Sequence, residues 1–275
     1  MSNQLARAAR FRALHAGPAS FVIPNVWDGG SAAIMAGLGF PALATSSAAC
    51  AAMLGRLDGQ ITRAEALAHA RQVIAATALP VSADLENGFG AAPEAAAETI
   101  RLAAEAGLVG GSIEDASGDE RTPIYDFAHA VERIAAAVEA ARHLPFAFVL
   151  TARAENFIHG RADLDDTVRR LQAFEQAGAD VLFAPCLPDL AAVRTVCTAV
   201  KKPVNFMVGV PGASFSVAEL TAAGVRRISL STTLYRAAMT GVLAAGREVK
   251  ELGTFTYLDR IMPGAELGKY LREKS

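Results

Sequence analysis

The sequence contains few of the residues that would indicate a disulfide-bonded, zinc-binding or membrane protein. Its three cysteines, Cys50, Cys186 and Cys197, are an odd number, and none has C-x-x-C spacing. This pattern argues against a disulfide framework and a cysteine-based zinc site, and it fits a reducing compartment. No stretch approaches the roughly 18 uninterrupted apolar residues of a membrane-spanning helix. The N-terminal residues also lack the apolar segment of a secretory signal. We therefore expect a cytoplasmic protein.

The sequence also lacks a strong excess of charge of either sign. Its formal net charge is -2 at pH 7, and its isoelectric point is about 6.2. A surface that binds nucleic acid or an anionic membrane needs clustered Lys and Arg. We therefore expect neither nucleic acid nor a membrane as a partner.

What the sequence has is a repeated pattern of short apolar runs separated by alanine-rich segments with helical spacing. Hydrophobic residues make up 52% of the 275 residues, which is enough for a large core. The apolar runs predict eight strands: Phe21–Val26, Ala42–Ser46, Pro80–Asp84, Gly111–Glu114, Phe146–Thr151, Val181–Ala184, Val204–Val208 and Arg227–Leu230. They recur about every 29 residues, as expected for strand–helix units.

Eight such units predict a (β/α)8 TIM barrel. The alternative, an open doubly wound sheet, is disfavoured because no G-x-G-x-x-G follows the first strand. No linker or second domain is apparent, so we expect one barrel domain over residues 1–275. Residues 253–275 lie beyond the eighth unit and form a predicted C-terminal extension that packs on the barrel or on a neighbouring subunit.

Acidic residues follow several of the predicted strands, where the active sites of such barrels lie. Asp84 and Glu86 follow the third strand, Glu114 ends the fourth, and Asp58 follows the second. Four carboxylates around one mouth repel each other unless some are protonated or a divalent cation lies among them. Oxygen ligands without His or Cys select Mg2+ or Mn2+. Taken singly, each acidic pair is also compatible with helix capping or a solvated loop, and the metal site is predicted from their joint occurrence.

Arg153 follows the fifth predicted strand and faces the same mouth. It could be a structural ion-pair partner of these acids. In a mouth with a metal site, its guanidinium is also suited to bidentate binding of a substrate carboxylate.

Four stretches, "ATSSAACAAMLGRLDG", "VSADLENGFG", "GSIEDAS" and "VLTARAENF", resemble the isocitrate lyase / phosphoenolpyruvate mutase superfamily. The resemblance extends over about residues 21–239 and includes 2-methylisocitrate lyase-like and carboxyphosphonoenolpyruvate mutase-like members. It implies a Mg2+-dependent enzyme that cleaves or forms a C–C or P–C bond beside a small 2-oxo carboxylate, through a metal-stabilised enolate. It also implies a homotetramer, a dimer of dimers, in which a C-terminal helix is exchanged between subunits.

The resemblance assigns roles to the predicted site residues. Asp84 would contact the metal directly, and Asp58, Glu86 and Glu114 would hold its waters. Arg153 and Glu114 are the predicted catalytic residues, and Arg153 would stabilise negative charge as it develops on the substrate. The predicted substrate-binding residues are Ser46, Ser47, Ala48, Asp84, Arg153 and Asn205.

The sequence also departs from the superfamily pattern. Lyases of the superfamily carry a K-K-C-G-H loop whose Cys is a general acid, whereas residues 116–123 here read ASGDERTP. A position usually occupied by Glu or His is Pro185. These departures favour oxaloacetate decarboxylation over isocitrate or methylisocitrate cleavage. They leave open a 2-oxo acid binding protein with little turnover, and a phosphonate P–C bond mutase or hydrolase.

Overall fold

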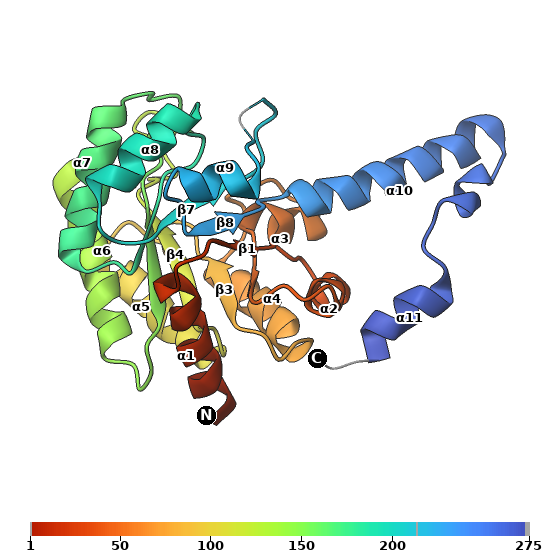
Figure 1. The fold of residues 1–275 in the computed structure, drawn as a ribbon, viewed down its shortest axis with the longest axis horizontal. Coiled ribbons are helices and arrows are strands. Elements are labelled where there is room, and N and C mark those ends of the chain that lie inside the picture. Colours follow the sequence, from red (N-terminus) through yellow and green to blue (C-terminus); the bar gives the residue numbers. More distant parts are fainter. Residues whose placement is uncertain (1, 213, 273–275) are drawn as a thin grey trace.

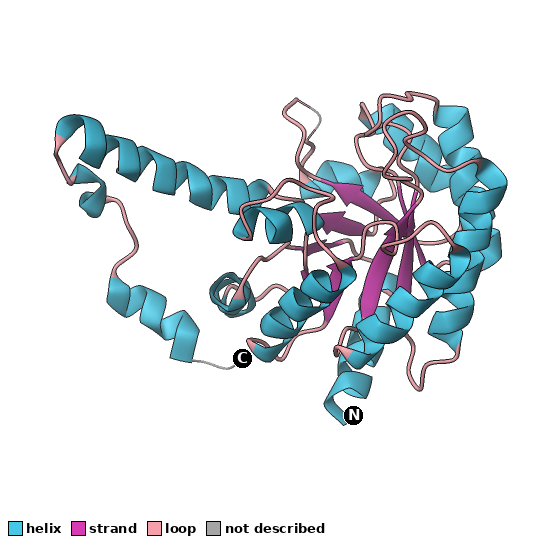
Figure 2. Cartoon of the chain, turned by 180° about the vertical axis from the view of Figure 1, so that it is seen from behind, coloured by secondary structure: helices cyan, strands magenta, loops and turns pink. Residues whose placement is uncertain are grey.

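The computed structural model describes residues 2–212 and 214–272, in which eight parallel strands are surrounded by helices (Figures 1 and 2). The strands are β1 (Phe21–Ile23), β2 (Leu43–Ala44), β3 (Val81–Asp84), β4 (Gly110–Glu114), β5 (Val149–Arg153), β6 (Val181–Phe183), β7 (Val204–Met207) and β8 (Arg227–Ser229). Their order is β1-β8-β7-β6-β5-β4-β3-β2. A parallel bridge between Asn25 and Ala44 links β1 to β2 and closes the ring. The predicted TIM barrel is confirmed.

Each predicted strand corresponds to an observed strand, with shifted ends. β1 ends at Ile23, because Pro24 has no N–H group for the ladder. β5 starts at Val149, where its pairing with Gly110 begins, and it extends to Arg153. Arg153 is therefore the last residue of a strand rather than a loop residue, and its side-chain direction is fixed by the barrel.

The helices that alternate with these strands form the outer layer. They are α2 (Gly29–Gly37), α3 (Ser47–Met53), α4 (Arg63–Ala75), α5 (Pro93–Glu105), α6 (Phe127–Arg142), α7 (Leu164–Ala177), α8 (Leu190–Ala199) and α9 (Val217–Ala222). The Thr62–Glu65 capping box starts α4, and the Ser216–Glu219 box starts α9. Within the described ranges, no helix combines the length and apolar character needed to cross a membrane.

A helix before the first strand, α1 (Ser2–Ala16), closes the N-terminal end of the barrel. Its Phe11 is fully buried in a cluster that includes Phe21 and Val149. A Cβ atom on Gly110 would lie 2.7 Å from Phe11 Cε1. The glycine therefore makes room for the aromatic ring, and the barrel opens only at its other end.

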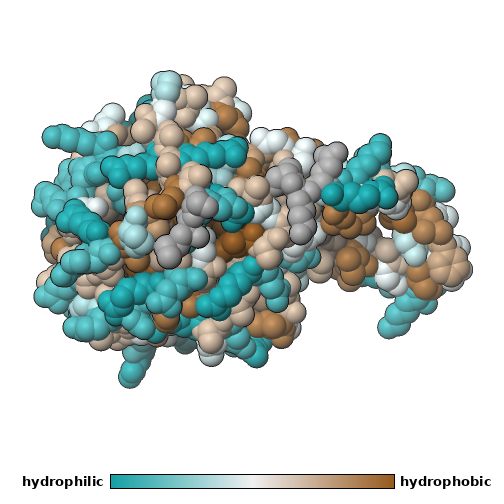
Figure 3. Space-filling view, turned by 90° about the horizontal axis from the view of Figure 1, so that it is seen from below, coloured by the Kyte–Doolittle hydropathy of each residue, from teal (hydrophilic) through white to brown (hydrophobic). Residues whose placement is uncertain are grey.

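The C-terminal segment forms an arm that leaves the barrel. It comprises α10 (Thr233–Leu252), a 3-10 turn η1 (Thr256–Asp259) and α11 (Gly264–Arg272). Figure 1 shows α10 projecting away and α11 returning beside α2. No side chain of α10 is buried, and apolar side chains are visible on the arm in Figure 3. The departure from the barrel thus begins with α10, before the extension predicted from residue 253.

Candidate active site

A cavity of about 740 Å³ lies at the C-terminal ends of the strands. The barrel opens here because α1 blocks the other end, so this mouth is where side chains from many strands meet solvent. All the predicted site residues line the cavity: Ser46, Ser47, Ala48, Asp58, Asp84, Glu86, Glu114, Arg153 and Asn205.

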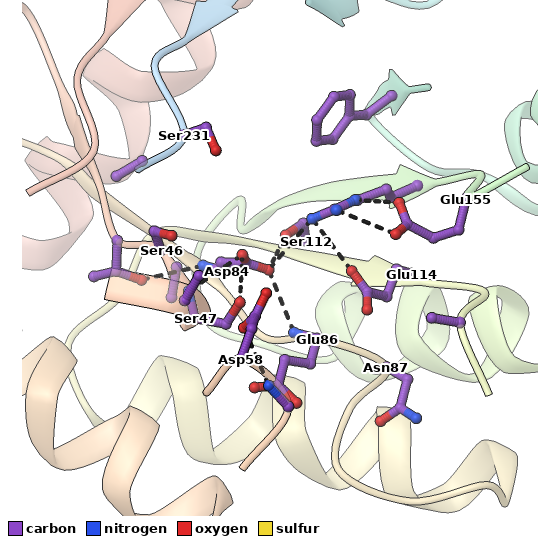
Figure 4. Close-up of a pocket in the computed structure, with 18 of the residues that line it drawn as sticks. Ser46, Ser47, Asp58, Asp84, Glu86, Asn87, Ser112, Glu114, Glu155 and Ser231 are labelled. Carbon is purple, nitrogen blue, oxygen red and sulfur yellow. Dashed lines mark hydrogen bonds and ion pairs between the residues drawn. The ribbon is translucent and has the colours of Figure 1, made fainter. Parts of the chain in front are cut away.

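Asp84, the last residue of β3, is held by hydroxyl groups from two neighbouring strand ends (Figure 4). The backbone N–H and the hydroxyl of Ser47 donate to its Oδ2 over 3.3 Å and 3.1 Å. The hydroxyl of Ser112, on β4, donates to Oδ1 over 3.3 Å. The carboxylate is therefore fixed in direction. The Ser47 amide, predicted to bind a substrate carboxylate, contacts Asp84 here.

Glu86 reaches the cavity by a different geometry from the one the sequence pattern suggests. A regular strand would point residues 84 and 86 to the same side, but β3 ends at Asp84 and Glu86 has φ 48°, in the left-handed region. The turn continues through Gly88, with φ 81°, where a Cβ atom would lie 2.9 Å from Ala96 Cα. A tight turn packed on α5 therefore aims Glu86 into the mouth.

A buried arginine on the outer layer holds this turn. Arg133, on α6, is 1% exposed and donates from Nη1 to the carbonyl of Gly90 over 2.7 Å and from Nη2 to that of Asn87. Its Cζ also lies 4.6 Å from the centre of the Tyr125 ring. Arg133 satisfies carbonyls that have no strand partner, and it thereby positions the acid-bearing loop. The sequence did not indicate this role, because an arginine in an amphipathic helix is usually a surface residue.

Arg153 is the cation at the centre of the acids. Its Nη1 lies 3.2 Å from Glu114 Oε2 and 3.8 Å from Asp84 Oδ1. Its Nε and Nη2 both donate to the carboxylate of Glu155. Glu155 is 2% exposed and was not among the predicted site residues. Its position two residues after Arg153 is the sequence signal that could have identified it.

Several carboxyl groups lie around Arg153 in the cavity, and the pKa values of three of them are raised. Burial, and then the neighbouring Asp84 and Asp58, raise the pKa of Glu86 to about 8. Burial raises the pKa of Glu114 well above its ordinary value and that of Glu155 to about 7. Glu86 Oε1 is buried without a hydrogen-bond partner among the described residues. The site therefore disfavours the charged form of these carboxyl groups unless a cation neutralises them.

The donor set fits a hard divalent cation held partly through water. The side chains that converge here offer carboxylate and hydroxyl oxygens, the ligands of Mg2+ and Mn2+. In the part of the chain that the structure describes, no three His, Cys, Asp or Glu side chains are grouped closely enough to hold an ion by themselves. Asp84 is held in direction by Ser47 and Ser112, which makes it the best candidate for a direct ligand.

The wall of the cavity formed by β7 and β8 has one cation and no acid among the described residues. Asn205, on β7, is 1% exposed and donates to Ser229 Oγ over 3.0 Å. Its Oδ1 accepts from Nε of Arg227, on β8, over 2.8 Å. On the acidic side, His159 Nε2 lies 4.0 Å from Glu155 Oε2. Arg227 was not predicted as a site residue.

The loop after β4 is short and carries no thiol. Residues 116 and 124 form an antiparallel bridge, and the Ser117 N–H donates to the Pro123 carbonyl over 2.9 Å. Ala116 and Gly118 are its contributions to the cavity wall. Cys50 is buried, and burial raises its pKa to about 11. Ala116 and Gly118, the described loop residues that line the cavity, have no ionisable side chain that could donate a proton.

This geometry agrees with comparisons with known proteins. Residues 11–250 match the family model described as phosphoenolpyruvate phosphomutase. The chain belongs to this family. Among solved structures, a Burkholderia cenocepacia J2315 protein described as a lyase or mutase superposes with a TM-score of 0.97. It is 52% identical, and the match covers 99% of this chain and 98% of that one.

Several relatives of this chain have named activities, and two of them differ in the reaction named. A 2-methylisocitrate lyase from Bacillus subtilis is 33% identical over 68% of this chain and 62% of its own length. An oxaloacetate decarboxylase from Bradyrhizobium diazoefficiens is 31% identical over 72% of this chain and 69% of its own. The family and these relatives support a lyase-type enzyme that cleaves a carbon–carbon bond.

Proposed function

We propose that this protein is a Mg2+-dependent carbon–carbon lyase for a small 2-oxo carboxylate. The observation that carries the proposal is the cluster of Asp84, Glu114 and Glu155 around Arg153 in one cavity. The carboxylates of this cluster would bind a divalent cation, and the guanidinium of Arg153 lies beside that site. Oxaloacetate decarboxylation is the preferred reaction, because it needs no protein acid to protonate a large leaving group. Isocitrate and 2-methylisocitrate cleavage are the less favoured reactions.

Each group of site residues has a separate role in this reaction. A bound divalent cation would polarise the oxygens of the 2-oxo acid as a Lewis acid. Arg153 donates hydrogen bonds to the oxygen on which negative charge grows as the C–C bond breaks. Glu114 and Glu155 hold the guanidinium in place, so little reorganisation is needed when charge develops. The backbone at Ser46 and Ala48 orients the substrate carboxylate, Ser47 holds Asp84, and Asn205 contacts the far end of the substrate.

A second candidate is a 2-oxo acid binding protein with little turnover. The observation that favours it is the short loop of residues 116–124, which brings no thiol or amine to the cavity. Such a protein would keep the cation and the carboxylate contacts and lack a proton donor. Phosphonate chemistry is a third candidate, and the same short loop argues against it.

A proton NMR time course with Mg2+ separates these candidates. The compounds tested singly are oxaloacetate, isocitrate, 2-methylisocitrate, dimethylmalate and 2-oxoglutarate, with Asp84→Ala as the control for decay caused by free metal. We expect oxaloacetate consumption well above that control. Equal rates with wild type and Asp84→Ala for all compounds would refute the lyase proposal, and binding without consumption would favour the second candidate.

A further inference from the structure

His159 lies in the cavity wall beside the carboxylate that holds Arg153. Its Nε2 lies 4.0 Å from Glu155 Oε2, and both oxygens of Glu155 accept from the guanidinium of Arg153. The other described residues of this wall include no histidine, lysine, cysteine or tyrosine. The carboxyl groups of the wall belong to the proposed cation site or to the partners of Arg153. His159 is therefore the side chain of the wall that is best suited to exchange a proton near neutral pH.

A short turn after β5 fixes the place of His159. The His159 N–H donates to the Glu155 carbonyl over 3.2 Å, which brings the two side chains to the same side of the turn. Asn156, in the same turn, is 1% exposed, and its Nδ2 donates to Oδ2 of Asp166, on α7, over 2.8 Å. The turn is thus anchored to the outer layer of the barrel, and His159 is held next to the Glu155 and Arg153 pair.

The surroundings of His159 suit a proton donor that solvent can recharge. Its side chain is 35% exposed, whereas that of Glu155 is 3% exposed. Water therefore reaches the imidazole ring but not the carboxyl group that faces it. Burial, and then the charges of Arg153 and Arg161, lower the pKa of His159, so its charged ring is a stronger acid than that of a free histidine.

The proposed decarboxylation needs a proton at one particular carbon. When oxaloacetate loses CO2, the electron pair of the broken bond remains on C3, C2 and the C2 oxygen as an enolate. Pyruvate forms when C3 gains a proton. In the proposed function, Arg153 contacts the oxygen on C2, and C3 is bonded directly to C2. A donor beside Arg153 is therefore close to the carbon that needs the proton.

We propose that His159 is the catalytic residue that protonates C3 of this enolate. The inference rests on the proposed function and adds the proton donor of its last step. The C3–C4 bond breaks, CO2 leaves, and the electron pair stays on the enolate. The charged ring of His159 then gives one N–H proton to C3, becomes neutral and regains a proton from water. No oxidant, reductant or further reactant is needed.

The alternative is that His159 only supports Glu155 and, through it, Arg153. A glutamine at this position could still donate a hydrogen bond to the Glu155 carboxylate, but it could not transfer a proton to carbon. His159→Gln therefore separates the two roles. Binding of oxalate, a planar dianion shaped like the enolate of pyruvate, reports whether Arg153 is still in place.

The reverse of the protonation step gives the most direct measurement. Proton NMR in D2O with Mg2+ follows the exchange of the methyl protons of pyruvate for deuterium. We expect exchange by wild type and a rate about 100-fold lower in His159→Gln. His143→Gln is the matched control, because His143 caps α6 and does not line the cavity, and it should exchange at the wild-type rate.

Two further measurements exclude a purely structural role. Isothermal titration should show that His159→Gln binds oxalate about as tightly as wild type. In His159→Ala, added imidazole should restore part of the exchange, after subtraction of the exchange that imidazole causes without protein. Rescue is expected because the side chain is 35% exposed, so a small base can enter from solvent.

Three results would overturn the inference. His159→Gln could exchange at the wild-type rate, or it could lose exchange and oxalate binding together, which would leave only the supporting role. Wild type could consume oxaloacetate without exchanging pyruvate protons, in which case the lyase proposal stands and the proton donor is wrong. If wild type does neither, the proposed function fails as well.

Discussion

Glu114 and Asp115 are adjacent in sequence and belong to two different clusters of acids and arginine. Glu114 faces the cavity with Asp84 and Glu155 around Arg153. Asp115 is 1% exposed, and its Oδ2 accepts from Arg170 Nη1 over 2.9 Å. We call the first set the inner cluster. The second, in which Arg170 also contacts Asp166, is the outer cluster.

The outer cluster is a structural ion pair, whereas the inner cluster has the features of a binding site. In the outer cluster, Asp115 also accepts from the Glu155 N–H over 2.8 Å, so it has partners on both oxygens. In the inner cluster, Asp84, Glu114 and Glu155 share one guanidinium, and the neighbouring Glu86 has an Oε1 without a hydrogen-bond partner among the described residues. The outer cluster is complete without a ligand, whereas the inner cluster has room and charge for a cation.

The largest effect on turnover should follow from changing the inner arginine. Arg153→Lys keeps the charge but loses the planar fork that contacts both Glu155 and Glu114. We expect kcat to fall about 100-fold, because one preorganised donor to the developing charge is lost. Steady-state kinetics with oxaloacetate measure this. A change in KM alone would indicate that Arg153 only binds the ground state.

Glu86, which lies beside the inner cluster in the cavity, should make stability depend on pH in cation-free protein. The pKa of Glu86 rises from 4.5 to about 8 on folding, so the folded state binds more protons than the unfolded state between these values. Stability should therefore fall as pH rises from about 5 to 8. Urea unfolding in EDTA measures the slope, which Mg2+ and Glu86→Gln should each reduce. The same slope in Glu86→Gln would contradict this origin.

A smaller effect on turnover should follow from changing the outer cluster. Asp115→Asn keeps an acceptor for the Glu155 N–H but leaves Arg170 with less counter-charge. We expect a loss of about 3 kcal/mol in the free energy of unfolding, as for other broken buried pairs. Activity per folded molecule should stay close to wild type. Urea unfolding and kinetics on the same sample test both parts. A large fall in kcat without loss of stability would assign Asp115 to the chemistry.

The smallest effect on chemistry should come from the C-terminal arm, because no described residue of α10, η1 or α11 lines the cavity. Val242 and Leu243 on α10 are 63% and 54% exposed. We propose that a second copy of the chain covers them, with helix exchange in a tetramer. Val242→Asp with Leu243→Asp should reduce the mass measured by light scattering, and Leu5→Asp on α1 should not. A monomeric wild type would contradict this.

The barrel and its acids were predictable because they depend on local pattern. Strand and helix periods repeat along the chain, and the C-terminal ends of parallel strands meet at one place. Arg227 was not predictable in the same way. Arg226 and Arg227 are adjacent, so strand alternation places one of them inside the barrel, but two arginines resemble a solvated strand. The role of Arg133 could not be predicted from the sequence either, because its carbonyl partners lie in a loop more than 40 residues earlier.

The proposed chemistry depends most on a divalent cation that is bound at the inner cluster through Asp84. Titration of Mn2+ into wild type and Asp84→Ala, followed by the paramagnetic resonance signal of free Mn2+, tests it directly. The account predicts one tight site per chain in wild type and its loss in a folded Asp84→Ala. Equal Mn2+ binding by the two proteins, or none by wild type, would contradict it.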